Sequence, residues 1–122
     1  MEQLLLLLLL QIKHCYADFM VQSYAQTVRK GVYRDLVGIS HSLDHVVATT
    51  IALFVFSLWH TIPPLTILGI ALLEGIAHYH IDWVKVRYGC KDSTRSAFWA
   101  EFGIDQFAHQ LCYILIITYI CL

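Results

Sequence analysis

The stretch Glu74-Gly-Ile-Ala-His78-Tyr-His80-Ile-Asp82-Trp-Val-Lys85 lies at the end of a long apolar segment. Glu74, His78 and Asp82 are four residues apart, so on an α-helix they share one face and form a polar stripe. Ionisable side chains are costly inside an apolar helix and usually mark a functional site. His80 lies about 200° around the helix from His78, so we expect it to be structural.

Three other apolar segments carry a pair of ionisable residues with the same four-residue spacing. These pairs are His14 with Asp18, His41 with His45, and Asp105 with His109. A single pair is explained by hydrogen bonds that hold neighbouring helices together. Four pairs, one in each segment, favour metal or proton chemistry over simple packing.

The composition predicts an integral membrane protein. The chain of 122 residues is 58% hydrophobic and only 14% charged, which leaves too little polar surface to cover a soluble domain. This length predicts a single domain, residues 1–122. A formal net charge of −1 provides no basic surface for nucleic acid. The four cysteines form no CxxC motif, so neither a thiolate zinc site nor a redox pair is indicated.

Four apolar segments approach the length of about 20 residues that a helix needs to cross a bilayer. We therefore predict an all-α, four-helix transmembrane bundle with up-down-up-down topology and a shared His/Asp polar site. The predicted helices cover residues 2–24, 36–62, 65–88 and 97–122. Pro63-Pro64 ends the second helix, because proline cannot continue a helix, and a very short turn is expected there.

This topology predicts that the four polar pairs meet. The pairs lie near the C-terminal ends of the first and third helices and near the N-terminal ends of the second and fourth. Antiparallel neighbours bring these ends together, at a depth of roughly 5–20 Å from one surface. Lysines and arginines concentrate near residues 29–34 and 85–95. The positive-inside rule therefore places that surface on the cytoplasmic side of the cell's inner (cytoplasmic) membrane. Both termini are then expected on the outer side of this membrane.

Imidazole and carboxylate ligands suit a divalent metal, zinc above iron or manganese, and water completes a catalytic site. The candidate metal ligands are His14, Asp18, His41, His45, His78, Asp82, Asp105 and His109. Eight ligands are too many for one zinc ion, so we expect two metals that share a carboxylate, or one metal surrounded by orienting groups. Glu74 and Asp44 are candidate catalytic bases, and Lys85 is a candidate contact for a substrate anion.

The motifs together resemble those of a known family. They are His14-x-x-x-Asp18-Phe19-x-x-Gln22, His41-x-x-x-His45, His78-x-x-Ile81-Asp82-x-x-Lys85 and Asp105-Gln106-x-x-His109. The family consists of small polytopic membrane proteins of bacteria and phages and is catalogued as a domain of unknown function. The resemblance covers nearly the whole chain and implies a membrane protein with an unassigned His/Asp constellation. A looser similarity extends to membrane-bound metal-dependent hydrolases and zinc-dependent phospholipases C.

Three functions are compatible with this sequence. The first is a metal-dependent hydrolase of a lipid or lipid-linked phosphate at the cytoplasmic leaflet, since metals lower the pKa of bound water to about 7. The second is a metal-ion or proton transporter, which needs a homo-oligomer because no polar route reaches the far surface within one chain. The third is a structural or host-interaction membrane protein whose bundle is clamped by metal or hydrogen bonds.

A b-type haem is a weaker alternative for the cofactor, because a carboxylate lies beside every histidine pair and would be costly next to a porphyrin.

Overall fold

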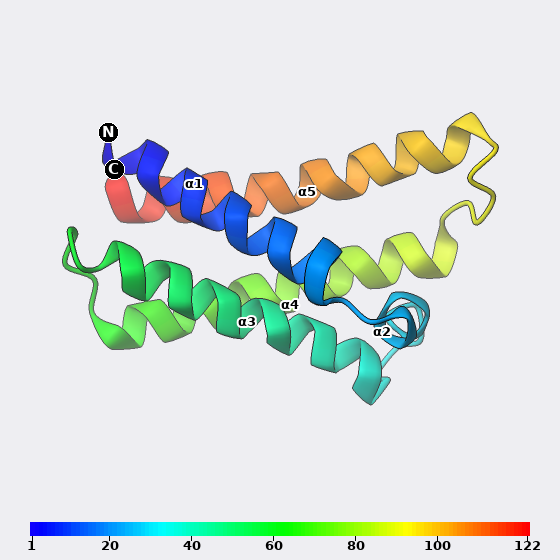
Figure 1. Cartoon of the computed structure of the whole chain (residues 1–122), viewed down its shortest axis with the longest axis horizontal. Helices are drawn as coiled ribbons and strands as arrows, with labels where there is room; N and C mark the ends of the chain where they lie inside the picture. The colour runs from blue at the N-terminus through cyan, green and yellow to red at the C-terminus, as the bar shows by residue number, and fades with distance from the viewer.

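Long apolar segments separated by polar connections fold into antiparallel helices in the computed structural model, which describes residues 1–122 (Figure 1). The elements in chain order are α1 (Glu2–Cys15), the π-helix η1 (Tyr16–Val21), α2 (Tyr24–Arg29), α3 (Leu36–Phe56), α4 (Pro64–Tyr88) and α5 (Ser96–Cys121). Four helical stretches are long and apolar enough to cross a membrane. These are Glu2–Val21, Leu36–Phe56, Pro64–Tyr88 and Ser96–Cys121.

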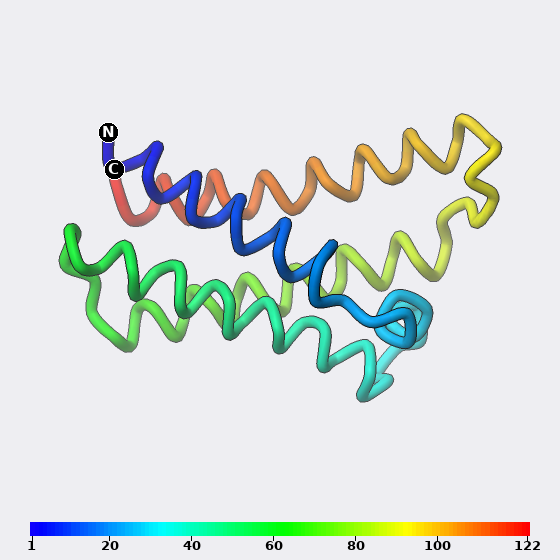
Figure 2. Tube along the Cα trace, in the orientation of Figure 1, coloured from blue at the N-terminus to red at the C-terminus, as the bar shows by residue number.

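The bundle has the predicted up-down-up-down topology. Both termini lie at one end, together with the α3–α4 connection, and α2 and the α4–α5 connection lie at the other (Figures 1 and 2). Helix α1 packs against α3 and α5, while α4 packs against α3 and α5 from the other side. The predicted all-α membrane bundle with a shared His/Asp cluster is therefore confirmed.

Burial in this bundle is reversed relative to a soluble protein. Polar and charged residues outnumber hydrophobic ones among the buried residues, whereas large apolar side chains such as Leu73 and Leu115 are exposed along the helices. Near the termini, Leu6, Leu53 and Phe56 form part of a purely apolar core. The polar cluster fills the half of the bundle toward α2. An apolar exterior around a polar interior fits a lipid environment.

Two predicted helix ends are wrong. The first helix ends at Val21 rather than residue 24, and its last turn is π-helical. The second ends at Phe56 rather than residue 62, because the N–H groups of Leu58 and Trp59 bond three residues back and tighten the chain. Residues 57–63 therefore link α3 and α4, where a very short turn was expected. The other two predicted helices agree with α4 and α5 to within one residue.

Helix α2 is short, but it is firmly attached. Ser23 and Gln26 form a capping box at its start. It lies directly on α3 because Gly38 has no side chain, and a Cβ there would lie 2.9 Å from the Cα of Lys30. This close approach directs Lys30, at the end of α2, into the bundle.

Candidate metal centre

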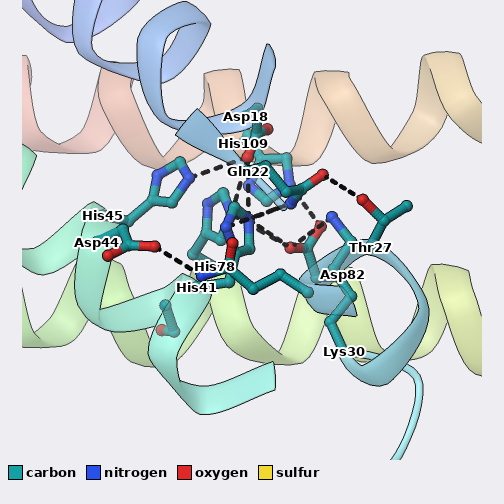
Figure 3. A network of polar contacts seen from close by, with 12 residues as sticks. Asp18, Gln22, Thr27, Lys30, His41, Asp44, His45, His78, Asp82 and His109 are labelled. Atoms are coloured by element: carbon teal, nitrogen blue, oxygen red, sulfur yellow. Dashed lines mark hydrogen bonds and ion pairs between the residues drawn. The ribbon is translucent and has the colours of Figure 1, made fainter. Parts of the chain in front are cut away.

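The eight candidate ligands lie in one cluster inside the bundle, although they come from α1, η1, α3, α4 and α5. Figure 3 shows six of them pointing toward one another beside Lys30 and Gln22. His14 joins through Asp18, with 3.3 Å between its Nε2 and Asp18 Oδ2. Asp105 joins through His109, with 3.7 Å between carboxylate Oδ1 and ring Nε2.

Three donor atoms at the middle of the cluster form a nearly equilateral triangle. The Nε2 atoms of His41 and His78 are 3.4 Å apart, and Asp82 Oδ2 lies 3.3 Å from each. Tetrahedral zinc with bonds of 2.0–2.1 Å places its ligands about 3.3 Å from one another. Asp18 Oδ1 lies beside the same edge, 3.1 Å from His41 Nε2 and 3.5 Å from His78 Nε2. The triangle of His41, His78 and Asp82 atoms therefore has the spacing of metal ligands, and Asp18 lies beside it.

A second group of donors shares His78 and Asp82 with the first. His109 Nε2 lies 3.6 Å from Asp82 Oδ1, the oxygen that does not face His41. The donor atoms of His78, Asp82 and His109 form one potential metal-binding group, and those of Asp18, His41, His45 and His78 form another. Asp82 presents Oδ2 to His41 and His78 and Oδ1 to His109, so its carboxylate could bridge two metal ions.

His14 has both ring nitrogens engaged by protein partners. Its Nδ1 lies 2.8 Å from the Tyr113 hydroxyl and its Nε2 lies 3.0 Å from Gln106 Oε1. The Gln106 amide nitrogen donates to Asp105 Oδ2 at 3.2 Å, which fixes the amide oxygen toward His14. His14 must therefore carry its proton on Nε2 and accept the Tyr113 hydroxyl proton at Nδ1, so neither nitrogen is free for a metal.

His45 is constrained in a similar way. Its Nδ1 lies 3.3 Å from the Lys13 ammonium, and its Nε2 lies 2.9 Å from Asp18 Oδ1. An ammonium group only donates hydrogen bonds, so Nδ1 accepts and Nε2 carries the ring proton. His45 is therefore arranged to donate to Asp18 and hold that carboxylate in place.

His78 shows the opposite arrangement. Its Nε2 faces the donor triangle, and its Nδ1 lies 3.8 Å from Glu74 Oε1. That separation is too long for a hydrogen bond, so His78 Nδ1 has no hydrogen-bond partner, and Nε2 is the ring nitrogen that faces the other donors. Glu74 itself accepts hydrogen bonds from Lys13 and Thr49, each at 2.9 Å. The predicted base Glu74 thus lies behind His78, between α1, α3 and α4.

The other two predicted functional side chains lie at the edge of the cluster. Asp44 is half-buried and accepts a hydrogen bond of 2.8 Å from the Gln26 amide. It lines an apolar groove between α1 and α3, away from the donor triangle. Lys85 is 24% exposed, and its ammonium lies 4.0 Å from Asp105 Oδ2. Lys85 thus stands between the cluster and the outside.

Two lysines of the cluster, Lys13 and Lys30, were not among the predicted site residues, and Gln22 was quoted only as part of a motif. Lys30 was counted as a surface loop charge, but it is 7% exposed and its ammonium lies 3.0 Å from Asp82 Oδ2. Gln22 places its amide nitrogen 2.8 Å from His41 Nε2. Lys13 is buried against Glu74. The signal for Lys13 was its position in an apolar helix, beside His14 and away from the basic connections. The signal for Gln22 was its position four residues after Asp18, and Lys30 had none.

The cluster carries unpaired polar atoms and an excess of negative charge. Four buried atoms lack a hydrogen bond, namely His78 Nδ1, Asp82 Oδ2, Asp105 Oδ1 and His109 Nε2, although Asp82 Oδ2 forms the ion pair with Lys30. Two buried ammonium groups, those of Lys13 and Lys30, and the partly exposed ammonium of Lys85 face four carboxylates, those of Asp18, Glu74, Asp82 and Asp105. With neutral imidazoles, this balance leaves negative charge that a divalent cation would neutralise. The residues therefore fit a divalent metal.

Comparison with known proteins identifies the family and no relative of known activity. A family model described as "Protein of unknown function (DUF3307)" matches residues 4–122. No curated protein and no solved structure matches the chain. The match agrees with the resemblance in the four polar motifs.

Proposed function

Since the chain belongs to the DUF3307 family, whose description names no reaction, we propose a function from the site itself. We infer that the protein is an integral-membrane hydrolase that holds a divalent metal, preferably zinc, and cleaves a lipid or lipid-linked phosphate at the cytoplasmic leaflet. The observation that carries this proposal is the triangle of His41, His78 and Asp82 atoms, 3.3–3.4 Å apart, in a cluster with surplus negative charge.

The hydrogen bonds divide the predicted ligands into two roles. We assign Asp18, His41, His78, Asp82 and His109 to metal binding, and at His41 the metal would displace the Gln22 amide, whose nitrogen lies 2.8 Å from the ring Nε2. We assign His14 and His45 to orientation, because the two ring nitrogens of each contact two different protein groups. Glu74 lies 3.8 Å from His78 Nδ1, and we propose that its charge orients this ring. Partners of this kind fix ligand geometry and are typically worth 10–100-fold in metal affinity.

Hydrolysis is favoured over transport by where the polar network stops. It extends from the donor triangle to Lys13, Glu74 and Thr49, and beyond these the apolar core closes the bundle toward the termini. An ion would therefore have no polar exit within one chain. A one-sided site suits a reaction on a phosphate group at the nearer leaflet.

The metal would supply an activated water, and residues at the edge of the cluster would handle the substrate and its proton. Lys85 is placed to hold the phosphate. Asp105 has a buried carboxylate oxygen without a hydrogen bond and lies beside both Lys85 and His109. We therefore propose Asp105 as the proton acceptor. It ranks ahead of Glu74, whose two oxygens accept hydrogen bonds from Lys13 and Thr49, and ahead of Asp44, which lines the groove between α1 and α3.

Elemental analysis of the full chain purified in detergent tests the metal. We expect stoichiometric divalent metal in the unmodified protein, loss of that metal in His78→Asn, and no change in His80→Asn. His80 is a matched control because it is on the same helix but exposed. Phosphate release from lipid phosphates in proteoliposomes should then stop on chelation and return when the metal is restored. Purification without metal from metal-replete cells would overturn the proposal.

A further inference from the structure

A groove between α4 and α5 leads from the outside of the bundle to the edge of the cluster. Its volume is about 530 Å³. Val84, Ile104 and Ala108 contribute apolar walls. The ionisable groups of the lining are one ammonium, one imidazole and two carboxylates, those of Lys85, His80, Glu101 and Asp105. The groove residues span about two helical turns on each helix, or roughly 10 Å.

Lys85 also lines a second pocket, of about 470 Å³, at the α2 end of the bundle. That pocket contains two more cations, Arg87 and Lys91, and no carboxylate among its lining residues. An anion is therefore the complementary ligand. Lys85 stands where an apolar groove and a basic pocket meet, which matches a molecule with a hydrocarbon chain and an anionic head.

The position of Lys85 connects this junction to the metal centre. Lys85 follows Asp82 by three residues on α4, so the two side chains lie on the same face about one turn apart. Its ammonium is 4.0 Å from Asp105 and 4.9 Å from the centre of the Phe102 ring. A phosphate held by Lys85 would therefore lie next to the cluster.

We propose that the α4–α5 groove binds one hydrocarbon chain of a membrane lipid whose phosphate is held by Lys85, with Arg87 and Lys91 at the mouth. The ligand class is a lipid with an exposed, anionic phosphate monoester. The description of this groove as the substrate entrance rests on the proposed function, but lipid binding there does not require a metal. The occupant enters sideways from the bilayer, since the groove opens between two membrane helices.

Photocrosslinking of the full chain in nanodiscs tests this groove. The probe is phosphatidic acid with a photoreactive group in its acyl chain, and mass spectrometry locates the labelled residues. We expect labelling of residues 81–88 and 101–108, reduced about tenfold or more by Lys85→Gln, as loss of a charge-assisted hydrogen bond predicts. A photoreactive diacylglycerol, which has no phosphate, should be unaffected by Lys85→Gln.

A pair of tryptophan substitutions provides a matched control for chain binding. Ala108→Trp fills the α4–α5 groove, whereas Ala48→Trp fills the apolar groove between α1 and α3. We expect only the first to abolish labelling of α4 and α5. Unlabelled phosphatidic acid should also compete with the probe and reduce the labelling of α4 and α5 in the unmodified protein, which tests the same groove without a variant. Equal labelling around the bundle, or labelling that Ala108→Trp leaves unchanged, would overturn the proposal.

The labelling is carried out on metal-free His78→Asn as well as on the unmodified protein, which separates this inference from the proposed reaction. Groove labelling without lipid hydrolysis would retain the lipid site and reject the hydrolase. Hydrolysis in proteoliposomes without groove labelling would retain the hydrolase and reject this entrance.

Discussion

Lys30 and Asp82 form a buried ion pair in which the ammonium lies 3.0 Å from Asp82 Oδ2. The same oxygen is 3.3 Å from the Nε2 atoms of both His41 and His78. A lysine that follows α2 thus shares a carboxylate oxygen with the proposed metal position. The ammonium group and a metal ion would compete for this oxygen, so metal binding and the docking of α2 are coupled.

Replacing Lys30 by methionine should make the protein more dependent on metal. Without metal, Asp82 would lose its buried cation, and breaking such a pair typically costs about 3–5 kcal/mol. With metal bound, the ion itself would compensate Asp82. We therefore expect a lower Tm for metal-free Lys30→Met in detergent, and a larger rise in Tm on adding zinc than in the unmodified protein. Lys30→Arg should behave like the unmodified protein, and equal rises in all three would contradict the coupling.

The contact between α2 and α3 gives a prediction with an internal control. Gly38→Ala would place a Cβ 2.9 Å from the Cα of Lys30 and 3.1 Å from the carbonyl oxygen of Arg29, both backbone atoms that cannot turn aside. We expect a loss of about 1–3 kcal/mol and weaker metal binding, since overpacking would move Lys30. Gly69→Ala meets nothing within 4 Å and should be neutral or slightly stabilising. Thermal unfolding and metal titration of both variants measure the difference, and similar behaviour would argue against a tight α2–α3 contact.

The fold was predictable because it depends on signals that are local in sequence. The lengths of the apolar segments predicted the four membrane helices. The position of each polar pair along its helix predicted that the four pairs lie at a common depth. The details that failed depend on tertiary contacts. No local pattern shows that residues 16–21 form a π-helix, which repositions Asp18, or that α3 ends six residues before the predicted residue 62.

The cluster was predictable only in part for the same reason. Four-residue spacing identifies side chains that share a helix face, so the eight histidines and aspartates were found. Lys30 lies outside the long helices, and only the folding of α2 onto α3 brings it inside. Nor does spacing distinguish a metal ligand from an orienting group. That distinction depends on the partner of the second ring nitrogen, such as Gln106 for His14.

The division of roles among the histidines predicts graded effects on metal binding. His78→Asn removes a proposed ligand and should abolish stoichiometric binding. His14→Asn removes only an orienting group, so the site should still fill at saturating metal, with affinity about 10–100-fold weaker. Titration of both variants with zinc, monitored by calorimetry, distinguishes these outcomes. Complete loss of binding in His14→Asn would show that His14 is itself a ligand.

Asp35 at the start of α3 predicts a pH dependence outside the membrane helices. Its carboxylate caps α3 by accepting the N–H groups of Val37 and Gly38. The hydrogen bond from Arg29 lowers the pKa of Asp35 below its ordinary value. Since the folded-state pKa is the lower one, the stabilisation is present above about pH 4 and is lost as pH falls through the folded-state pKa. Asp35→Asn keeps a capping side chain but cannot ionise, so its difference in Tm from the unmodified protein should shrink between pH 7 and pH 3. A difference that is constant with pH would contradict this.

The ion pair between Lys13 and Glu74 should behave as a unit with His45 and His78. Lys13 bonds Glu74 and His45, and Glu74 lies behind His78, so each charge supports a different histidine. Lys13→Met or Glu74→Leu alone would leave an unpaired charge in the bundle, and each should destabilise by about 3–5 kcal/mol. The double variant removes both charges and should recover much of that stability, which a double-mutant cycle of thermal unfolding in detergent measures. Metal affinity should remain weak in the double variant, because His78 has lost its orienting carboxylate even though the fold is restored. Additive destabilisation, or full recovery of metal affinity together with stability, would show that the pair does not position these histidines.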